Sequence, residues 1–144
     1  MIEVRPARGA AELSAALALR HEVFVVEQRV PREEEYDGAD EQALHLVALE
    51  AGQVVGTCRL IVDRDTVTIG RVAVAAAARR RGLASRLLAE AEEHTRALGA
   101  RRIALAAQTG ALALYEQAGY TAYGERFLDA GIDHLMMEKD IAPA

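Results

Sequence analysis

Hydrophobic and polar positions change their spacing several times along the chain, and each change marks an expected element. Alternating or continuous apolar residues predict strands over residues 2–6, 44–50, 54–62, 67–74 and 102–107, with a last strand starting at His134. Apolar positions three and four residues apart predict helices over residues 12–25, 85–98 and 111–118. Residues 27–42 contain Pro31 and Gly38 and are expected to form a loop. This order, without repeat or linker, predicts one sheet with helices in an α/β or α+β fold.

Length and composition narrow the classes of protein. The 144 residues are enough for one domain with a core, and 51% hydrophobic with 27% charged residues is ordinary for a soluble protein. The chain shows neither a leader peptide nor a membrane-length apolar run, so we expect a cytoplasmic location. A net charge of −5 disfavours a nucleic-acid partner. One cysteine, Cys58, lies in an apolar strand and is expected to be buried, and the scattered histidines predict no metal site.

A basic turn between the strand 67–74 and the helix 85–98 is a candidate phosphate site. The first N–H groups of a helix lack internal partners and carry the positive end of its dipole. Gly82 lets a ligand approach the backbone, and the arginines can pair with phosphate oxygens. The turn matches neither the Walker loop nor the dinucleotide fingerprint. Its candidate cofactor-binding residues are Arg79, Arg80, Arg81, Gly82, Leu83, Ala84 and Ser85. An exposed arginine cluster at a helix start is the alternative.

A second motif follows the buried strand 102–107. Gln108 ends that strand, a short helix carries Tyr115 and Glu116, and Gly119-Tyr120 follows. Together the two motifs resemble the GNAT superfamily of acyl-CoA N-acyltransferases, whose pyrophosphate turn reads Arg/Gln-x-x-Gly-x-Gly/Ala. Gln108 stands where that superfamily usually has Asn, and the resemblance implies that it helps to bind the cofactor. Residues 19–28, with Val30-Pro31, Asp40, His45 and the tail 131–136, resemble the ElaA/YjcF-like branch.

The resemblance implies an α+β fold in a single domain, residues 1–144. Its sheet is mixed and mostly antiparallel, has helices on both faces, and its fourth and fifth strands splay to admit the pantetheine arm. The implied cosubstrate is acetyl-CoA, with no metal. Backbone N–H donors for the oxyanion are implied near Val72, Ala73 and Val74. The implied activity is transfer of an acetyl group to a primary amine, on a small molecule or a peptide, by direct attack in a ternary complex.

Acetyl transfer to an amine needs acid and base groups. An alkylamine with a pKa of ~10.4 is only about one part in a thousand neutral near pH 7.4, so a base must take its proton. Tyr115 is the candidate acid for the departing thiolate, or else a core residue of its helix. Glu27, Asp37 and His45 are the base candidates. Glu27 follows an apolar stretch, which predicts a raised pKa, or it is a solvated charge. For His45, a structural role is the favoured alternative.

Candidate acceptor-binding residues are Arg20, Asp37, Arg71 and His134. Arg20 is expected either to clamp a substrate carboxylate or, preferably, to pair with acids of the loop. The segment 29–42 has six acidic and two basic residues, a local charge of −4, which predicts a rim that favours cationic amines. A solubilising loop is the alternative.

Two other functions remain open at this point. A non-catalytic CoA-binding regulatory module would retain the turn without turnover, and an acyl-homoserine-lactone-synthase-like enzyme is suggested by the pattern Leu-Arg-x-x-Val-Phe over residues 19–24. The expected partners are an amine acceptor, with neither nucleic acid nor membrane. A homodimer is allowed for, since the sequence does not fix the oligomeric state.

Overall fold

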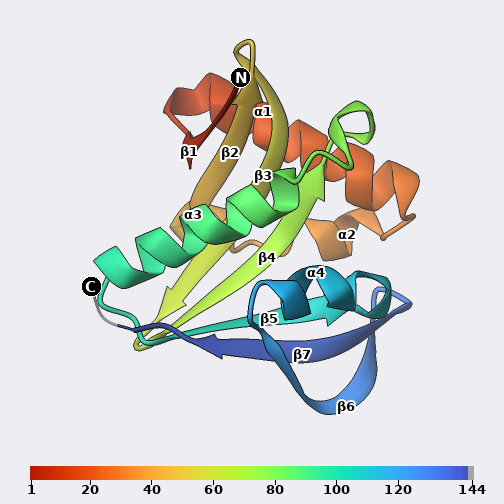
Figure 1. Ribbon diagram of the computed structural model, residues 1–144. Coiled ribbons are helices and arrows are strands. Elements are labelled where there is room, and N and C mark those ends of the chain that lie inside the picture. The colour runs from red at the N-terminus through yellow and green to blue at the C-terminus, as the bar shows by residue number, and fades with distance from the viewer. Residues whose placement is uncertain (143–144) are drawn as a thin grey trace.

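The computed structural model describes residues 1–142 as a seven-stranded sheet with helices against both faces (Figure 1). All neighbouring strands are antiparallel except β4 and β5, which run parallel. This mixed, mostly antiparallel sheet confirms the predicted fold class. In the order β1-β2-β3-β4-β5-β7-β6, the strands are β1 (Ile2–Pro6), β2 (Leu44–Glu50), β3 (Gln53–Asp63), β4 (Thr66–Val74), β5 (Arg102–Gln108), β7 (Ile132–Asp140) and β6 (Thr121–Asp129).

The helices divide between the two faces of the sheet. Helices α3 (Leu83–Ala97) and α4 (Leu112–Gln117) cover one face, and α1 (Gly9–Arg20) covers the other (Figure 1). The π-helix η1 (His21–Glu27) continues α1, and the short α2 (Arg32–Glu35) follows it. Three 3₁₀ turns lie at η2 (Asp40–Gln42), η3 (Ala76–Ala78) and η4 (Thr109–Ala111). None of the helices within residues 1–142 is both long and apolar enough to cross a membrane.

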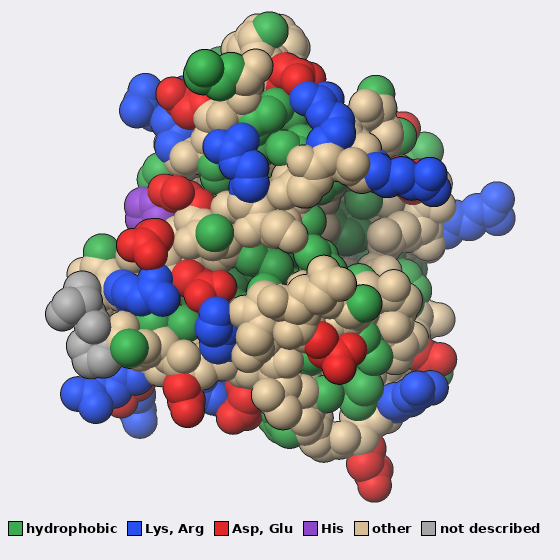
Figure 2. Space-filling model, viewed as in Figure 1, with side chains coloured by type: hydrophobic (Ala, Val, Ile, Leu, Met, Phe, Trp, Pro, Cys, Tyr) green, Lys and Arg blue, Asp and Glu red, His purple; other side chains and the backbone are tan. Residues whose placement is uncertain are grey.

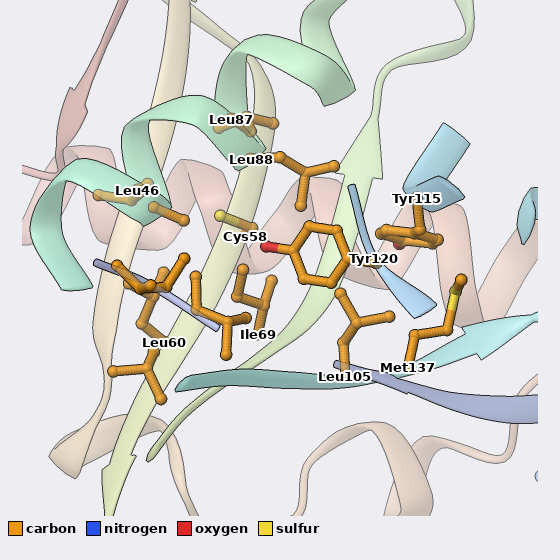
Figure 3. Close-up of a cluster of buried hydrophobic side chains, with 14 of the residues drawn as sticks. Leu46, Cys58, Leu60, Ile69, Leu87, Leu88, Leu105, Tyr115, Tyr120 and Met137 are labelled. Atoms are coloured by element: carbon orange, nitrogen blue, oxygen red, sulfur yellow. The ribbon is translucent and has the colours of Figure 1, made fainter. Parts of the chain in front are cut away.

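The main core lies between the sheet and helices α3 and α4. Leu87 and Leu88 of α3 are fully buried against the strands, as their spacing predicts. Burying one leucine side chain contributes roughly 1.5–3 kcal/mol. Cys58 is buried in the same cluster, as expected, and burial raises the pKa of its thiol to about 12. Figure 3 shows the Tyr120 hydroxyl pointing toward Cys58. This core holds β4 and β5 in place at one end.

Strands β4 and β5 separate at their other end. They pair only from Thr66 opposite Arg102 to Ile69 opposite Leu105, although both strands continue beyond these pairs. A bulge in the β3–β4 pairing coincides with Arg71, whose φ is +53°. A bulge bends its strand and redirects a side chain. The splay and the bulge together open the middle of the sheet.

One expected helix and one observed strand depart from the expectation, and the expected loop over residues 27–42 contains the short helix α2. The helix predicted over residues 12–25 begins earlier and widens after Arg20, where the Gln28 N–H donates to the Val23 carbonyl at 3.1 Å, five residues back. The sequence pattern predicts no strand over Thr121–Asp129, because most of its side chains are exposed and give no clear alternation. The wide helical turn matters for the site, since it places Phe24 and Gln28 beside the splay.

Candidate active site

The splay between β4 and β5 opens into a cleft of about 550 Å³. On the face covered by α3 and α4, Figure 2 shows a hollow between these helices with hydrophobic side chains inside it. Residues of η1, α2 and the hairpin β6–β7 also line the cleft. Because its walls come from elements on both faces of the sheet, the cleft can receive one ligand from each face.

The basic turn stands at the entrance on the α3 side. Gly82 caps α3 with φ of +77°, a left-handed conformation that favours glycine, and no side chain bonds to the first N–H groups of the helix. Ala84 and Arg79 line the cleft, whereas Leu83 is buried in the protein. Arg80 and Ser85 are exposed. The turn therefore offers an anion the uncapped backbone N–H groups at the start of α3, with exposed arginines beside them.

Two of the three arginines in the turn already have acidic partners. Arg79 binds both carboxylate oxygens of Glu27, at 2.8 and 2.7 Å, and donates to the Val74 carbonyl. Arg81 pairs with Glu50. The hydrogen bond from Arg79 lowers the pKa of Glu27. The predicted rise in that pKa is therefore wrong, because the carboxylate remains 44% exposed and the hydrogen bond from Arg79 outweighs its partial desolvation.

The expected oxyanion segment of β4 faces the cleft only in part. Val72 and Val74 line the cleft. Ala73 is buried against Leu19 and Val23, so its side chain faces the helices on the other side. Beyond Ile69 the edge of β4 has no strand beside it on the β5 side, which leaves backbone groups available there.

Tyr115 reaches the cleft from α4. Its ring packs against Tyr120 edge to face, with centroids 6.2 Å apart, and only 8% of the residue is exposed. Burial raises the pKa of its hydroxyl to about 12. Within residues 1–142 this hydroxyl forms no hydrogen bond, and, unlike that of Tyr120, it is not buried away from solvent. Tyr115 thus presents a protonated hydroxyl to the cleft.

Gln108, at the open end of β5, links this strand to the end of η1 on the opposite wall of the cleft. Its amide Nε2 donates to Gln28 Oε1 at 2.9 Å, and both residues line the cleft. The predicted role of Gln108 in cofactor binding remains a prediction. Gln28, which has no distinguishing signal in the sequence, anchors the end of η1 to β5 through this bond.

A closed ring of six charged side chains lies beside the cleft, and three of its members, Glu35, Arg59 and Arg71, line it. Arg20 binds Glu35 and Asp40 at 2.8 and 2.7 Å, and both members of the Arg20–Glu35 pair are almost completely buried. Arg59 continues from Asp40 to Asp37, at 3.1 and 2.8 Å. Arg71 closes the ring from Asp37 to Glu35, at 3.3 and 3.0 Å. The ring ties the acidic loop to α1, β3 and β4.

The ring decides between the roles expected for Arg20 and corrects the role expected for Asp37. Arg20 is completely buried and does not line the cleft, so it pairs with loop acids, as preferred from the sequence, and does not clamp a substrate. Asp37 also lies outside the cleft lining, and its hydrogen bond from Arg59 lowers the pKa of the carboxyl, which makes it a poor base. The predicted acidic rim is largely neutralised, because three arginines from outside the loop pair with three of its acids.

His45 is a structural residue and not part of the cleft. It is buried on β2, and its Nε2 lies 2.9 Å from the Asp40 carbonyl, which can only accept a hydrogen bond. The expected role of His45 as a base is therefore corrected: the imidazole holds the backbone of the acidic loop.

Arg71 and His134 do line the cleft, as expected for acceptor-binding residues. His134 pairs with Gln108 across β7 and β5, so both side chains stand on the same face of the sheet. Its ring stacks on Phe127, with centroids 5.7 Å apart. Arg71 reaches the cleft from the bulge of β4, where it also holds the carbonyls of Glu34 and Glu35.

Sequence reasoning missed two charged residues of the ring. Arg59 stands inside the apolar run 54–62, and a charged residue in a buried strand is a usable signal of a paired site. Glu35 is hidden in the sequence because Glu33 and Glu34 precede it, and only the structure separates the buried member from the exposed ones.

Comparison with known proteins agrees with this architecture. A family model described as "Acetyltransferase (GNAT) domain" matches residues 9–141. The uncharacterized N-acetyltransferase YjcF of Bacillus subtilis is 36% identical over 93% of this chain and 96% of its own length. Among solved structures, an acyl-CoA N-acyltransferase from Pseudomonas aeruginosa is 34% identical, with a TM-score of 0.87 over 96% of this chain and 99% of that one. Escherichia coli ElaA is 28% identical, with a TM-score of 0.86 over 96% and 99%.

The match to the family covers nearly the whole chain, and the similar proteins are matched over nearly their whole length. The splayed sheet, the glycine-capped helix and the cleft between them occupy the matched region. The chain therefore belongs to the GNAT family of acetyltransferases, in the branch that includes ElaA and YjcF.

Proposed function

We propose that this acetyltransferase uses acetyl-CoA to acetylate a primary amine by direct attack within a ternary complex. The observation that carries the proposal is the single cleft reaching both sides of the splay. Ala84 and Tyr115 line it on the α3 and α4 side, and Arg71 and His134 line it on the acceptor side. Thioester and amine can then meet in one cavity without a covalent enzyme intermediate.

The residues present fit coenzyme A. The uncapped start of α3 offers N–H groups to the pyrophosphate, and Gly82 keeps that approach free of a side chain. The unpaired edge of β4 after Ile69 offers backbone groups to the amides of the pantetheine arm, as an added strand would use them. Arg79 and Arg81 supply positive charge, and Arg79 exchanges Glu27 for phosphate when it binds.

We assign to Tyr115 the role of the acid that protonates the departing thiolate. In the transfer the N–C bond forms, the C–S bond breaks, and the sulfur takes a proton. A phenol hydroxyl is protonated at neutral pH, so Tyr115, which lines the cleft, has the proton to donate. Val72 and Val74 also line the cleft, and the nearby backbone N–H groups of β4 are proposed to stabilise the oxyanion.

Thiol release from acetyl-CoA over a panel of primary amines tests the proposal. The panel contains alkylamines, free amino acids, polyamines and peptides with a free N-terminus or lysine. We expect amine-dependent release, the acetylated amine in the mass spectrum, and intersecting initial-velocity lines. Parallel lines would contradict direct attack, and absence of release with every amine would contradict amine acetylation.

A further inference from the structure

We infer that His134 is the general base that takes the proton from the acceptor amine. This inference rests on the proposed function and assigns a role that none of the base candidates found in the sequence can fill. Glu27, Asp37 and His45 all lie outside the cleft lining, and Arg59 also holds Asp37. Three features of His134 suit this role: its position beside the splay, the tautomer of its ring, and the access of Nε2 to the cleft.

The position of His134 follows from the sheet register. It stands opposite Gln108, three residues beyond Leu105, where β5 has already parted from β4. Side chains of directly opposite residues share a face of the sheet. His134 is thus beside the splay, on the same face as Gln108, where both line the cleft.

A backbone carbonyl fixes the tautomer of the ring. Nδ1 of His134 lies 2.7 Å from the carbonyl oxygen of Ile132. Because a carbonyl oxygen only accepts, Nδ1 must carry the hydrogen, and in the neutral ring Nε2 keeps its lone pair. Stacking on Phe127 holds the ring plane. The imidazole is therefore pre-oriented as a proton acceptor through Nε2.

Nε2 is open to the cleft. Within the described part of the chain it has no hydrogen-bond partner, and it is not among the polar atoms buried without one. The charged groups that line the same cavity are Asp129 of β6, which stands opposite Ile132 of β7, and, from other elements, Arg59, Arg71, Glu34, Glu35 and Arg79. None of these is in an ion pair with His134. A proton on Nε2 would thus come from a bound ligand or from water.

The proton balance closes. An ammonium acceptor loses two protons on becoming an amide. The first goes to His134 Nε2 and from there to water, which frees the lone pair that forms the N–C bond. As the C–S bond breaks, the sulfur takes a proton from Tyr115, and the second proton of the amine restores the phenol through solvent. One proton is released in each turnover.

The test compares His134→Gln with His94→Gln, using the best alkylamine from the thiol-release panel. His94 is a matched control, since it lies on α3 beside Glu90 and does not line the cleft. We expect His134→Gln to lower kcat/KM for the amine by roughly 10²-fold at neutral pH, with coenzyme A affinity unchanged. The deficit should narrow as pH rises toward the amine pKa of ~10.4, where the acceptor loses its proton unaided. Added imidazole should partly rescue His134→Ala.

Nitrogen-15 NMR of histidine-labelled protein, with His134→Gln to assign the signals, supplies a readout that does not depend on turnover. For the neutral form of the ring, we expect the pattern of an imidazole with its hydrogen on Nδ1 and not on Nε2. A ring protonated at Nε2, or an amine deficit in His134→Gln that is the same at every pH, would overturn the assignment. If the wild type acetylates amines and His134→Gln does so equally well, only the role of His134 fails. If the wild type acetylates none, the proposed function fails.

Discussion

Arg79 donates hydrogen bonds to both carboxylate oxygens of Glu27, which lies 52 positions earlier in the sequence. Arg79 also lines the entrance of the cleft. The pair joins the end of η1 to the turn before α3. An arginine fork of this geometry is also the form that binds phosphate. Under the proposed function, the glutamate and a cofactor phosphate would compete for one side chain.

This competition predicts opposite effects for the two partners. Glu27→Gln should tighten coenzyme A binding by about two- to fivefold, the range expected from an exposed ion pair. Arg79→Ala should weaken binding, and the loss should shrink as salt rises. Calorimetric titration measures both, with Arg101→Ala as a control for net charge, since Arg101 lies outside the cleft. Weaker binding in Glu27→Gln would instead show that the pair organises the entrance.

Gly82 is predicted to be required for its backbone conformation. A Cβ at Gly82 or at Gly110 would meet nothing within 4 Å, but only Gly82 has a positive φ, of +77°. Gly82→Ala should therefore lower the free energy of unfolding by roughly 1–2 kcal/mol and weaken coenzyme A binding. Gly110→Ala is the matched control. Equal effects in urea unfolding and in titration would mean that the left-handed turn is not the reason for the glycine.

Much of the fold could be predicted from the sequence because its signals are local. The apolar spacing of α3 and the alternation of β4 each depend on neighbouring residues only. The glycine turn before α3 is also local, and it leads to the cofactor side of the site. The strand β6 was missed because its exposed residues carry no such pattern.

The acceptor side could not be predicted in the same way, because it is made by contacts between distant positions. The acidic loop carries a charge of −4 in the sequence, yet Arg20, Arg59 and Arg71 approach it from three other elements. The Ile132 carbonyl, which fixes the His134 tautomer, is only two residues away in the sequence. The contact nevertheless depends on the side-chain rotamer of His134, which the sequence does not show. Long-range pairing and rotamers leave no trace in local spacing.

The buried pair of Arg20 and Glu35 predicts a large loss of stability on truncation. Arg20→Met would leave Glu35 and Asp40 without their main partner, and breaking a buried pair costs about 3–5 kcal/mol. Arg96→Ala, which removes a more exposed pair with Glu93 on α3, should cost less than about 1 kcal/mol. Urea unfolding of the two variants measures the difference. Similar small losses would mean that water or rearrangement satisfies the carboxylates.

Acid should weaken the same ring. Arg59 hydrogen bonds lower the pKa of Asp37 in the folded protein below its value in the unfolded chain. The stability from this carboxylate is fully present above the unfolded pKa of ~3.9 and is lost as pH falls through the lower, folded value. Asp37→Asn should be less stable than the wild type at pH 7, and the difference should shrink on acidification below pH ~4. If the difference in the free energy of unfolding between the two proteins is the same at every pH in this range, Asp37 does not contribute to the loss of stability in acid.

Tyr115→Phe should distinguish a catalytic role of the hydroxyl from a packing role of the ring. The substitution keeps the ring against Tyr120 and removes a hydroxyl that has no partner within residues 1–142. Stability at neutral pH should therefore change little. If proton donation to the thiolate limits the rate, kcat should fall by roughly 10²-fold while the KM for acetyl-CoA stays nearly constant.

The hydroxyl also predicts a difference at high pH. Burial raises the pKa of Tyr115 from 10.0 to about 12 in the folded protein, so its contribution to stability is fully present below pH 10 and is lost as pH rises toward 12. Phenylalanine does not titrate, so the stability of the wild type should fall more steeply than that of Tyr115→Phe in this range. Steady-state kinetics at neutral pH and urea unfolding from pH 9 to 12 measure the two effects independently. If kcat is unchanged and the two stability curves are parallel, the Tyr115 hydroxyl neither donates a proton nor is desolvated in the folded protein. Tyr115 would then be a packing residue of α4.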